Sequence, residues 1–335
     1  MSWYFENGPE SDVVVSTRVR LARNIVGHKF VPKANEKELA EVMNLFQDNK
    51  IIPELRFVKL HDLDELMQHS LVEKHVISKD ILREKNAAIL LNNEEDVCVM
   101  INEEDHIRIQ AMKPGLDLHG ALKMAKEIDS KMVSKVEYAY SDLYGYLTAC
   151  PTNVGTGLRA SVMLHLPALR ITGRLGKVMD VVSKVNLNVR GVYGEGTEAV
   201  GDMYQVSNKA SLGMTNEEII VNVKAIVNKI IEQERKAREY LKDRGIDFED
   251  RVYRDFGILT SAKKISSNEC AKLISVVKLG VDMGIIKEIG SDQINQISIM
   301  TKPATLQKCY KEEFEPVQRD MKRAELIKNI IHKEK

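Results

Sequence analysis

The residues best suited to chemistry are arginines and acids on predicted strands and glycine-containing loops. Five arginines and two glutamates occupy four short segments: Arg18, Arg20, Arg108, Arg159, Arg190, Glu104 and Glu195. Arginine presents a planar, permanently charged fork that suits phosphate oxygens, and a glutamate can accept or orient a proton. This combination is what phosphoryl transfer requires when no P-loop is present.

The first segment, STRVR at 16–20, follows a β-branched stretch that predicts a strand. Alternation along a strand places Arg18 and Arg20 on one face, where they would form an anion clamp. Solvated surface arginines or internal ion pairs explain this segment equally well when it is taken alone.

The second segment, VCVMINEEDHIRIQ at 97–110, alternates as one extended strand would. In such a strand, Asn102, Glu104, His106 and Arg108 project from the same side. Glu104 and Arg108 are then about 13 Å apart, at ~3.3 Å per residue, which leaves room for a ligand. An edge strand with a solvated polar face is the alternative.

The third segment, CPTNVGTGLRA at 150–160, combines Asn153, Gly155 and Gly157 with Arg159. These small residues permit tight positive-φ turns. No GK[ST] follows, so the loop is not a Walker A motif. A plain hairpin turn is the simpler explanation.

The fourth segment, VRGVYGEGTEA at 189–199, sets Glu195 between two glycines, after Arg190. A carboxylate on such a loop can pack close to a substrate, or it can simply be exposed.

Composition excludes several classes of protein. The chain is 44% hydrophobic and 29% charged, and 49 basic residues balance 49 acidic ones, which argues against extended disorder and a dedicated nucleic-acid surface. No apolar run approaches the ~20 residues of a membrane span, and the N-terminus lacks a signal-peptide pattern. The four cysteines have neither zinc-site nor disulfide-scaffold spacing. We therefore expect a cytoplasmic protein with reduced thiols, no membrane or nucleic-acid partner, and no residue assigned as a metal ligand.

The order of predicted elements indicates two domains. The stretch NEKELAEVMNLFQ predicts an early helix, strands follow after about residue 85, and a Thr–x–x–Glu capping box at Thr215 opens a long helix. Beyond residues 243–247 the pattern is purely helical. We expect a catalytic domain at 1–243 and a helical domain at 244–335.

The four segments, in this order, resemble the signatures of the ATP:guanidino phosphotransferases, or phosphagen kinases, over roughly residues 12–242. The resemblance implies an α+β catalytic domain, with a mostly antiparallel sheet flanked by helices, of the glutamine-synthetase type. It also implies that ATP and Mg²⁺ are the cofactors.

Site roles follow from the resemblance, position by position. Glu104, Glu195 and Cys150 look like the catalytic residues, with a nearby substrate cation favouring the Cys150 thiolate. The implied nucleotide contacts are Ser16, Thr17, Arg18, Val19, Arg20, His75, Arg108, Arg159, Ala160, Ser161, Val162, Met163, Arg190, Gly191, Val192, Tyr193, Gly194 and Glu195.

Two further features are similar to the bacterial protein arginine kinases: only fifteen residues precede STRVR, and a helical region follows residue 245. This similarity implies an open site for arginine side chains of other proteins, marking of those proteins for Clp proteolysis in the stress response, an activator partner and a homodimer. It also assigns RDMKRA, with Arg319, Asp320, Arg323 and Ala324, to a regulatory phosphoarginine-binding pocket.

Two alternatives remain at this point. The chain could phosphorylate free arginine or another small guanidino compound, or it could be an inactive adaptor that binds phosphoarginine. The presence of both glutamates and all five arginines argues against the adaptor, because a pure binder needs no proton acceptor.

Overall fold

The computed structural model describes residues 3–48, 52–185, 187–191 and 199–332. Within them, eight strands form one antiparallel sheet, and this confirms the predicted fold class. In sheet order the strands are β2 (Arg56–Lys59), β3 (Ala88–Leu91), β4 (Val97–Ile101), β5 (Ile107–Pro114), β1 (Val14–Arg23), β8 (Leu158–His165), β10 (Met203–Asn208) and β9 (Leu187–Gly191).

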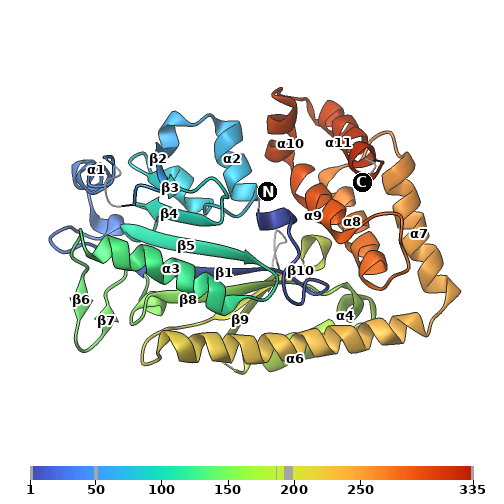
Figure 1. The fold of residues 1–335 in the computed structure, drawn as a ribbon, viewed down its shortest axis with the longest axis horizontal. Helices are drawn as coiled ribbons and strands as arrows, with labels where there is room; N and C mark the ends of the chain where they lie inside the picture. Colours follow the sequence, from blue (N-terminus) through green and yellow to red (C-terminus); the bar gives the residue numbers. More distant parts are fainter. Residues whose placement is uncertain (1–2, 49–51, 186, 192–198, 333–335) are drawn as a thin grey trace.

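The two faces of the sheet differ in chemistry. Residues that lie directly opposite each other on antiparallel strands share a face. Val19 pairs with Ala160 and with Ala111, and all three side chains are fully buried. Two helices cover this apolar face, α3 (Leu118–Val133) against β1 and β5 and α6 (Asn216–Lys242) against β8 and β10 (Figure 1).

The helices begin where local signals place them. Asn35 and Glu38 form a capping box at the start of α1 (Glu36–Asn44), and Thr215 and Glu218 form another at the start of α6. In each box the cap side chain accepts from the N3 main-chain N–H, which is otherwise unpaired. These observations confirm both predicted helices.

The segment 97–110 is a hairpin, so the prediction of a single strand was wrong. Strand β4 ends at Ile101 and β5 begins at Ile107. Asn102 adopts a positive φ of 59°, which asparagine tolerates better than most residues, and its amide donates to the carbonyl oxygens of Leu39 and Asn86. The chain therefore reverses at Asn102, and residues 102–106 form the turn.

The remaining elements are short helices and a small hairpin around the sheet, followed by the C-terminal helices. The first group comprises α2 (Glu65–Glu73), β6 (Tyr140–Ser141), β7 (Gly145–Tyr146), α4 (Pro167–Ile171) and α5 (Leu175–Ser183). The C-terminal group comprises α7 (Ile246–Ser261), α8 (Ser267–Asp282), α9 (Ser291–Met300), α10 (Pro303–Tyr310) and α11 (Pro316–Ile331). In Figure 1, α7 to α11 lie together beside the end of the sheet. Among the described residues, no helix combines the length and the apolar character that a bilayer crossing requires.

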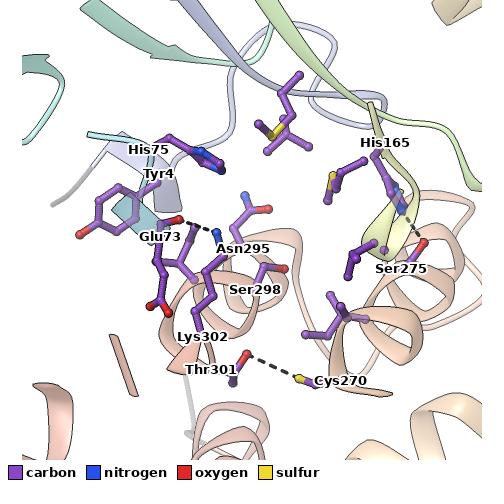
Figure 2. A pocket seen from close by; sticks show the side chains of 18 of the residues that line it. Tyr4, Glu73, His75, His165, Cys270, Ser275, Asn295, Ser298, Thr301 and Lys302 are labelled. Atoms are coloured by element: carbon purple, nitrogen blue, oxygen red, sulfur yellow. Dashed lines mark hydrogen bonds between the residues drawn. The ribbon is translucent and has the colours of Figure 1, made fainter. Parts of the chain in front are cut away.

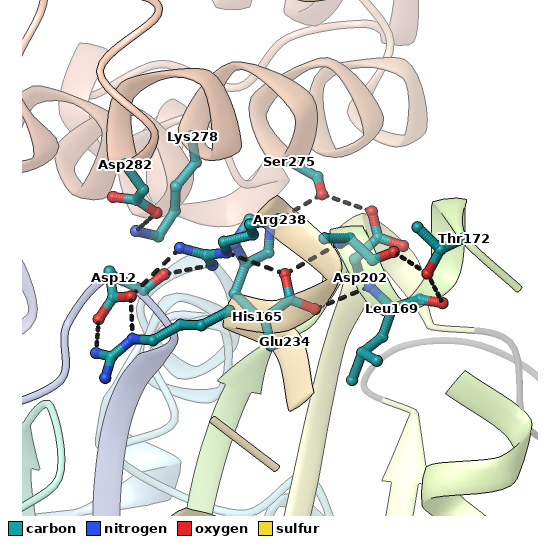
Figure 3. Close-up of polar contacts among 12 residues, drawn as sticks. Asp12, His165, Leu169, Thr172, Asp202, Glu234, Arg238, Ser275, Lys278 and Asp282 are labelled. Atoms are coloured by element: carbon teal, nitrogen blue, oxygen red, sulfur yellow. Dashed lines mark hydrogen bonds and ion pairs between the residues drawn. The ribbon is translucent and has the colours of Figure 1, made fainter. Parts of the chain in front are cut away.

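Buried polar contacts join α8 to the sheet (Figure 3). The Ser275 hydroxyl donates to Asp202 at 2.5 Å and lies 2.9 Å from Nε2 of His165. Burial lowers the pKa of His165 well below its ordinary value, and the charges of Lys278 and Arg238 lower it further. A neutral His165 that donates from Nε2 satisfies the serine, because the serine proton already points at Asp202.

Glu234 on α6 is a second buried anchor. Its carboxylate is fully buried and accepts from the main-chain N–H groups of Ala168 and Leu169 and from Nε of Arg238. Burial raises the pKa of Glu234, although these donors oppose that shift. Arg238 continues the network to the carbonyl oxygen of Asp12 at 2.8 Å. One carboxylate thus caps α4 and neutralises a buried arginine.

Removal of this carboxylate should be costly. We expect Glu234→Ala to lower the free energy of unfolding by about 3–5 kcal/mol, because it removes a buried charge partner from Arg238 and leaves two helix N–H groups without an acceptor. Urea denaturation of the full chain measures the change. Glu232→Ala, at an exposed position on the same helix, is the matched control and should change stability by less than ~0.5 kcal/mol. Equal effects in the two variants would contradict the assigned role.

Candidate active site

All five predicted arginines lie on the second face of the sheet, which we call the arginine face. Arg18 and Arg20 come from β1, Arg108 from β5, Arg159 from β8 and Arg190 from β9. The register places Arg20 directly opposite Arg159, and it places the other arginines at positions of the same parity. Four strands therefore direct guanidinium groups to the same side of the sheet.

The arginine face is electrostatically crowded. Burial lowers the pKa of Arg20 well below its ordinary value, and the neighbouring charges of Arg18, Arg108 and Arg159 add to the shift. Burial, followed by the charges of Arg190 and Arg108, lowers the pKa of Arg159 as well. Nε of Arg20 and Nε of Arg159 are buried and have no hydrogen-bond partner among the described residues. Such a face fits a polyanion such as a nucleotide triphosphate, which would relieve both the repulsion and the unmet donors.

The turn after β4 places two glutamates against Arg108. Nη1 of Arg108 lies 2.5 Å from Glu103, and Nη2 lies 3.1 Å from Glu104. The hairpin thus brings Glu104 and Arg108 into contact, so the expected separation of about 13 Å was wrong. The Glu103 side chain is 3% exposed, whereas that of Glu104 is 40% exposed. Glu104 therefore has carboxylate surface available to a substrate.

Glu103 is a positioning residue that the sequence analysis missed. Its carboxylate also accepts from the Ser78 hydroxyl at 2.6 Å and from the Glu104 main-chain N–H at 2.6 Å. It therefore orients both Arg108 and the backbone of Glu104. The doubled acid in NEED was the available signal, but the single-strand interpretation placed Glu103 on the wrong side.

Asp105 connects the same turn to the loop that carries Cys150. Its buried carboxylate accepts from the Asn24 amide and from the Ala149 main-chain N–H, both at 2.6 Å. Cys150 follows directly, half-buried, with Sγ 3.1 Å from the Thr152 hydroxyl. Glu104 and Cys150 partly oppose the lowering of the pKa of Arg159.

The glycines of the Cys150 loop have the predicted positive φ angles, 112° at Gly155 and 67° at Gly157. A Cβ on Gly155 would come within 2.8 Å of Leu212 Cα, and one on Gly157 within 2.5 Å of the Ala22 carbonyl oxygen. The loop thus packs closely against neighbouring main chain. This packing delivers Cys150 and Arg159 to the same site.

The predicted nucleotide contacts divide between the two faces of the sheet. Ser16, Ser161 and Met163 lie on the arginine face beside Arg18 and Arg159. Thr17, Val19, Ala160 and Val162 alternate to the opposite face and are fully buried there. Their side chains do not reach the arginine face, so a nucleotide contact from these four positions would have to come from the main chain.

Other predicted contacts lie at the edges of this site. Gly191 ends β9 opposite Tyr204. His75 is half-buried, and its carbonyl oxygen accepts from the Gln110 amide at 2.9 Å. Val192, Tyr193, Gly194 and Glu195 lie outside the described residues.

The RDMKRA segment lies on α11, away from the sheet. Arg323 is fully buried, and it donates to the carbonyl oxygens of Thr301 and Ile265 and to Asp320. Arg323 therefore binds the main chain just before α8, at Ile265, and just after α9, at Thr301. It does not lie on a solvated helix face. Ala324 is also buried, and Arg319 and Asp320 are half-buried.

The described residues contain no group of three or more His, Cys, Asp or Glu side chains that could hold a metal ion. Mg²⁺ is commonly held by one or two carboxylates together with substrate phosphates, and not by a protein cage. Beside the arginine face, Glu104 has a carboxylate with exposed surface that fits such shared coordination, whereas the Glu103 carboxylate is 3% exposed and already accepts from Arg108 and Ser78.

Comparisons with known proteins agree with this geometry. Residues 36–237 match the model of the ATP:guanido phosphotransferase C-terminal catalytic domain, and residues 245–335 match the protein-arginine kinase McsB C-terminal domain. This chain belongs to the ATP:guanido phosphotransferase family. Its relatives include the protein-arginine kinase of Halothermothrix orenii, 47% identical over 98% of this chain and 96% of the relative. The protein-arginine kinase of Bacillus subtilis is 43% identical over 99% of this chain and 94% of its own length.

Solved structures of the family share the sheet. The duplicated taurocyamine kinase of Schistosoma mansoni superposes with a TM-score of 0.60 at 31% identity over 68% of this chain, and this chain spans about a third (34%) of that enzyme. Lombricine kinase has a TM-score of 0.56 at 28% identity and 68% coverage of both chains. The antiparallel sheet is therefore the fold of phosphagen kinases.

His106 lies in the turn beside the site, and its hydrogen bonds require one protonation state of the ring. The hairpin geometry can therefore be tested through the pH dependence of stability. Its Nδ1 accepts from the Ile25 N–H at 3.1 Å, and its Nε2 lies 2.9 Å from the Lys29 carbonyl oxygen. This arrangement requires a neutral ring that donates from Nε2. Burial lowers the pKa of His106, and the nearby His28 lowers it further.

We therefore expect acid to destabilise the fold through His106. The unfolded chain takes up this proton near pH 6.5 and the folded chain takes it up only at lower pH, so stability is lost as the pH falls from 7.5 to 5.5. Urea denaturation should show that about 1 kcal/mol of this loss disappears in His106→Gln. The exposed His61, changed to Gln, should leave the slope unchanged. A wild-type slope in His106→Gln would show that the pKa of His106 does not differ between the folded and unfolded chain, and this would contradict the prediction.

Proposed function

We propose that this protein is an ATP-dependent protein arginine kinase, which transfers the γ-phosphoryl group of ATP to arginine side chains of other proteins. The observation that carries the proposal is the exposed carboxylate of Glu104, held beside a face of five arginines. Its relatives at 43–47% identity over nearly their full length are protein-arginine kinases.

The mechanism follows from the placement of these groups. MgATP would supply the phosphoryl group, and its Mg²⁺ would supply positive charge beside the phosphates. The arginine face holds the phosphates and stabilises the charge that develops on the transferred group. A guanidinium has no free lone pair, so it cannot attack phosphorus while fully protonated. Glu104 orients the substrate guanidinium and accepts its proton as the N–P bond forms and the bond from phosphorus to the β-phosphate oxygen breaks.

Supporting residues keep these reactants aligned. Glu103 fixes Arg108 and the backbone of Glu104, and Asp105 ties that turn to the loop of Cys150. Cys150 would lie near the incoming guanidinium, and Glu195 is proposed as a second carboxylate. Alignment of this kind removes much of the entropic barrier to transfer.

Mass spectrometry is the direct test of the substrate class. An arginine-rich protein incubated with this chain and MgATP should carry acid-labile phosphate on arginine, searched for under neutral conditions. Glu104→Gln should abolish transfer, by more than about 100-fold as for loss of a general base, while nucleotide binding persists. Phosphate that appears on free arginine, with none on protein, would identify a kinase of small guanidino compounds instead. Unchanged turnover in Glu104→Gln would refute the assigned role of this carboxylate.

The cellular role and partners are part of the same proposal. The family resemblance supports a cytoplasmic enzyme that marks proteins for Clp proteolysis in the stress response and works with an activator protein. It also supports a homodimer formed through the C-terminal helices.

We also propose that RDMKRA contributes to a regulatory phosphoarginine pocket. Asp320 is 28% exposed and pairs with the fully buried Arg323 at 2.5 Å. Arg319, the residue before Asp320, is half-buried, so an acid and an arginine of the motif both retain exposed surface on α11. An acid can pair with the guanidino nitrogens of phosphoarginine, and an arginine can pair with its phosphate.

The pocket can be tested apart from the active site. Calorimetry with phosphoarginine on the Glu104→Gln protein should show binding that Asp320→Ala weakens about tenfold. Glu325→Ala, at an exposed position on the same helix, is the matched control and should keep the wild-type affinity. If the Glu104→Gln protein binds phosphoarginine with the same affinity with and without Asp320→Ala or Glu325→Ala, Asp320 does not contribute to phosphoarginine binding.

A further inference from the structure

A cavity of about 340 Å³ lies between the sheet and the C-terminal helices (Figure 2). Charged side chains that line it make contacts between these two parts of the chain. Lys302 donates to the carbonyl oxygen of Glu73 on α2, and Lys278 on α8 donates to the carbonyl oxygen of Ser11 at 3.3 Å. The cavity therefore belongs to the junction of sheet and helices. A surface of another kind, the β6–β7 hairpin, extends from the opposite end of the sheet in Figure 1.

The β6–β7 hairpin carries three large side chains that are mostly exposed. Tyr140, Leu143 and Tyr144 are 58%, 76% and 51% exposed, and Asp142 beside them is exposed as well. Within the part of the chain that the structure describes, Leu143 is the most exposed large hydrophobic residue. Clustered apolar side chains on a surface mark interaction sites, and tyrosine is enriched in interfaces. We call Tyr140, Leu143 and Tyr144 the tip.

Other aromatic contacts hold the base of this hairpin. Each strand contributes only two residues, which is too short for a hairpin to be stable alone. The Tyr146 ring lies against Arg23, with 3.6 Å from the guanidinium carbon to the ring centroid, and Arg23 pairs with Asp129 at 2.8 Å. Tyr140 packs edge-on against Tyr146 from the outer side. The base is therefore fixed, and it presents the tip in one position.

The β6–β7 hairpin is joined directly to the loop of Cys150. The main chain of Tyr146 exchanges two hydrogen bonds with that of Gly155, at 2.8 and 3.3 Å. Gly145 has a φ of 74°, and a Cβ there would come within 2.5 Å of the Gly155 carbonyl oxygen. The hairpin and the Cys150 loop therefore pack as one unit.

The same hairpin is also tied to the acidic turn. The Asn24 amide donates to the carbonyl oxygen of Leu147, just after β7, and to the carboxylate of Asp105. Asp105 follows Glu104, whose carboxylate is the exposed one of the site. The tip and the Glu104 carboxylate therefore belong to one hydrogen-bonded assembly.

This placement identifies the occupant of the tip. A protein substrate continues past its target arginine on both sides, whereas a free amino acid does not. Six residue steps separate Tyr144 from Cys150, so their Cα atoms lie at most about 20 Å apart. An extended segment rises ~3.3 Å per residue, so about six residues beside the target arginine cover that distance.

We propose that the tip is a docking site for the polypeptide segment that flanks the target arginine, and that an apolar residue of that segment packs against Leu143 and Tyr144. The inference rests on the proposed function, because it requires the substrate arginine to be part of a protein. The charge of Asp142 favours a segment that also carries basic residues. Such docking raises the affinity for a polypeptide through contacts remote from the reacting atoms.

Two peptides separate this inference from the proposed function. One has about 20 residues, with a central arginine flanked by leucines and lysines, so that it spans the site and the tip. The other is a capped tripeptide with a central arginine, which has no flanking segment. Phosphorylation of each with MgATP by the full chain is followed by mass spectrometry.

The double variant Leu143→Ser/Tyr144→Ser should raise the KM for the long peptide about tenfold, with kcat within about twofold. The ratio of kcat/KM for the long peptide to that for the tripeptide should therefore fall about tenfold. The reason is that only the long peptide loses contact area with the tip.

The matched control is Val221→Ser/Tyr240→Ser, which removes side chains of 52% and 50% exposure from α6, on the other face of the sheet. It should have the wild-type KM for both peptides, and thermal unfolding checks that each variant is folded. An unchanged KM for the long peptide in the tip variant overturns the inference.

Two other results also overturn the inference. Equal losses for both peptides would show that the tip acts on the reacting site itself. A change in sedimentation coefficient without a change in KM would identify a second copy of this chain as the occupant. A wild-type protein that phosphorylates neither peptide refutes the proposed function instead.

Discussion

The structure depends on one constraint, the repulsion among guanidinium groups that an antiparallel register forces onto one face of a sheet. Arg20 and Arg159 are cross-strand partners, and Arg18, Arg108 and Arg190 stand at positions of the same parity. Like charges in such positions destabilise a sheet. The apolar packing of the opposite face, under α3 and α6, compensates for this cost. The result is a preorganised positive field, which is what phosphoryl transfer requires.

Three consecutive acids in one turn beside this positive face have three different roles. Glu103 is buried and neutralises Arg108, Glu104 touches Arg108 but remains open, and Asp105 is buried and holds the loop before Cys150. Their burial separates their roles, since a buried and paired carboxylate positions its neighbours whereas an exposed one is free to meet a substrate. The turn is therefore both the support of the site and its reactive edge.

The C-terminal helices are joined to the catalytic sheet by polar groups that have little access to water. Ser275 meets Asp202 and His165, and Glu73 of α2 caps the start of α10 through two main-chain N–H groups (Figure 3 shows the first of these contacts). Arg323 continues the chain of contacts, because it binds the carbonyl oxygen of Thr301 at the edge of the cavity. A short path of hydrogen bonds thus runs from RDMKRA to the cavity wall.

Local patterns in the sequence determined much of this protein. Period-two alternation placed Arg18 and Arg20 on one face, the Thr215 capping box located the start of α6, and the glycines after Cys150 marked a positive-φ loop. Each of these features depends on a few neighbouring residues. Tertiary structure alone decided the reversal at Asn102, the burial of Glu103 and Arg323, and the cavity between β8 and α9. Asn102 bonds to Leu39 and Asn86, and Arg323 to Ile265, so these outcomes depend on residues far away in the chain. Alternation and capping are short-range effects, whereas burial and chain reversal depend on which distant groups satisfy a polar atom.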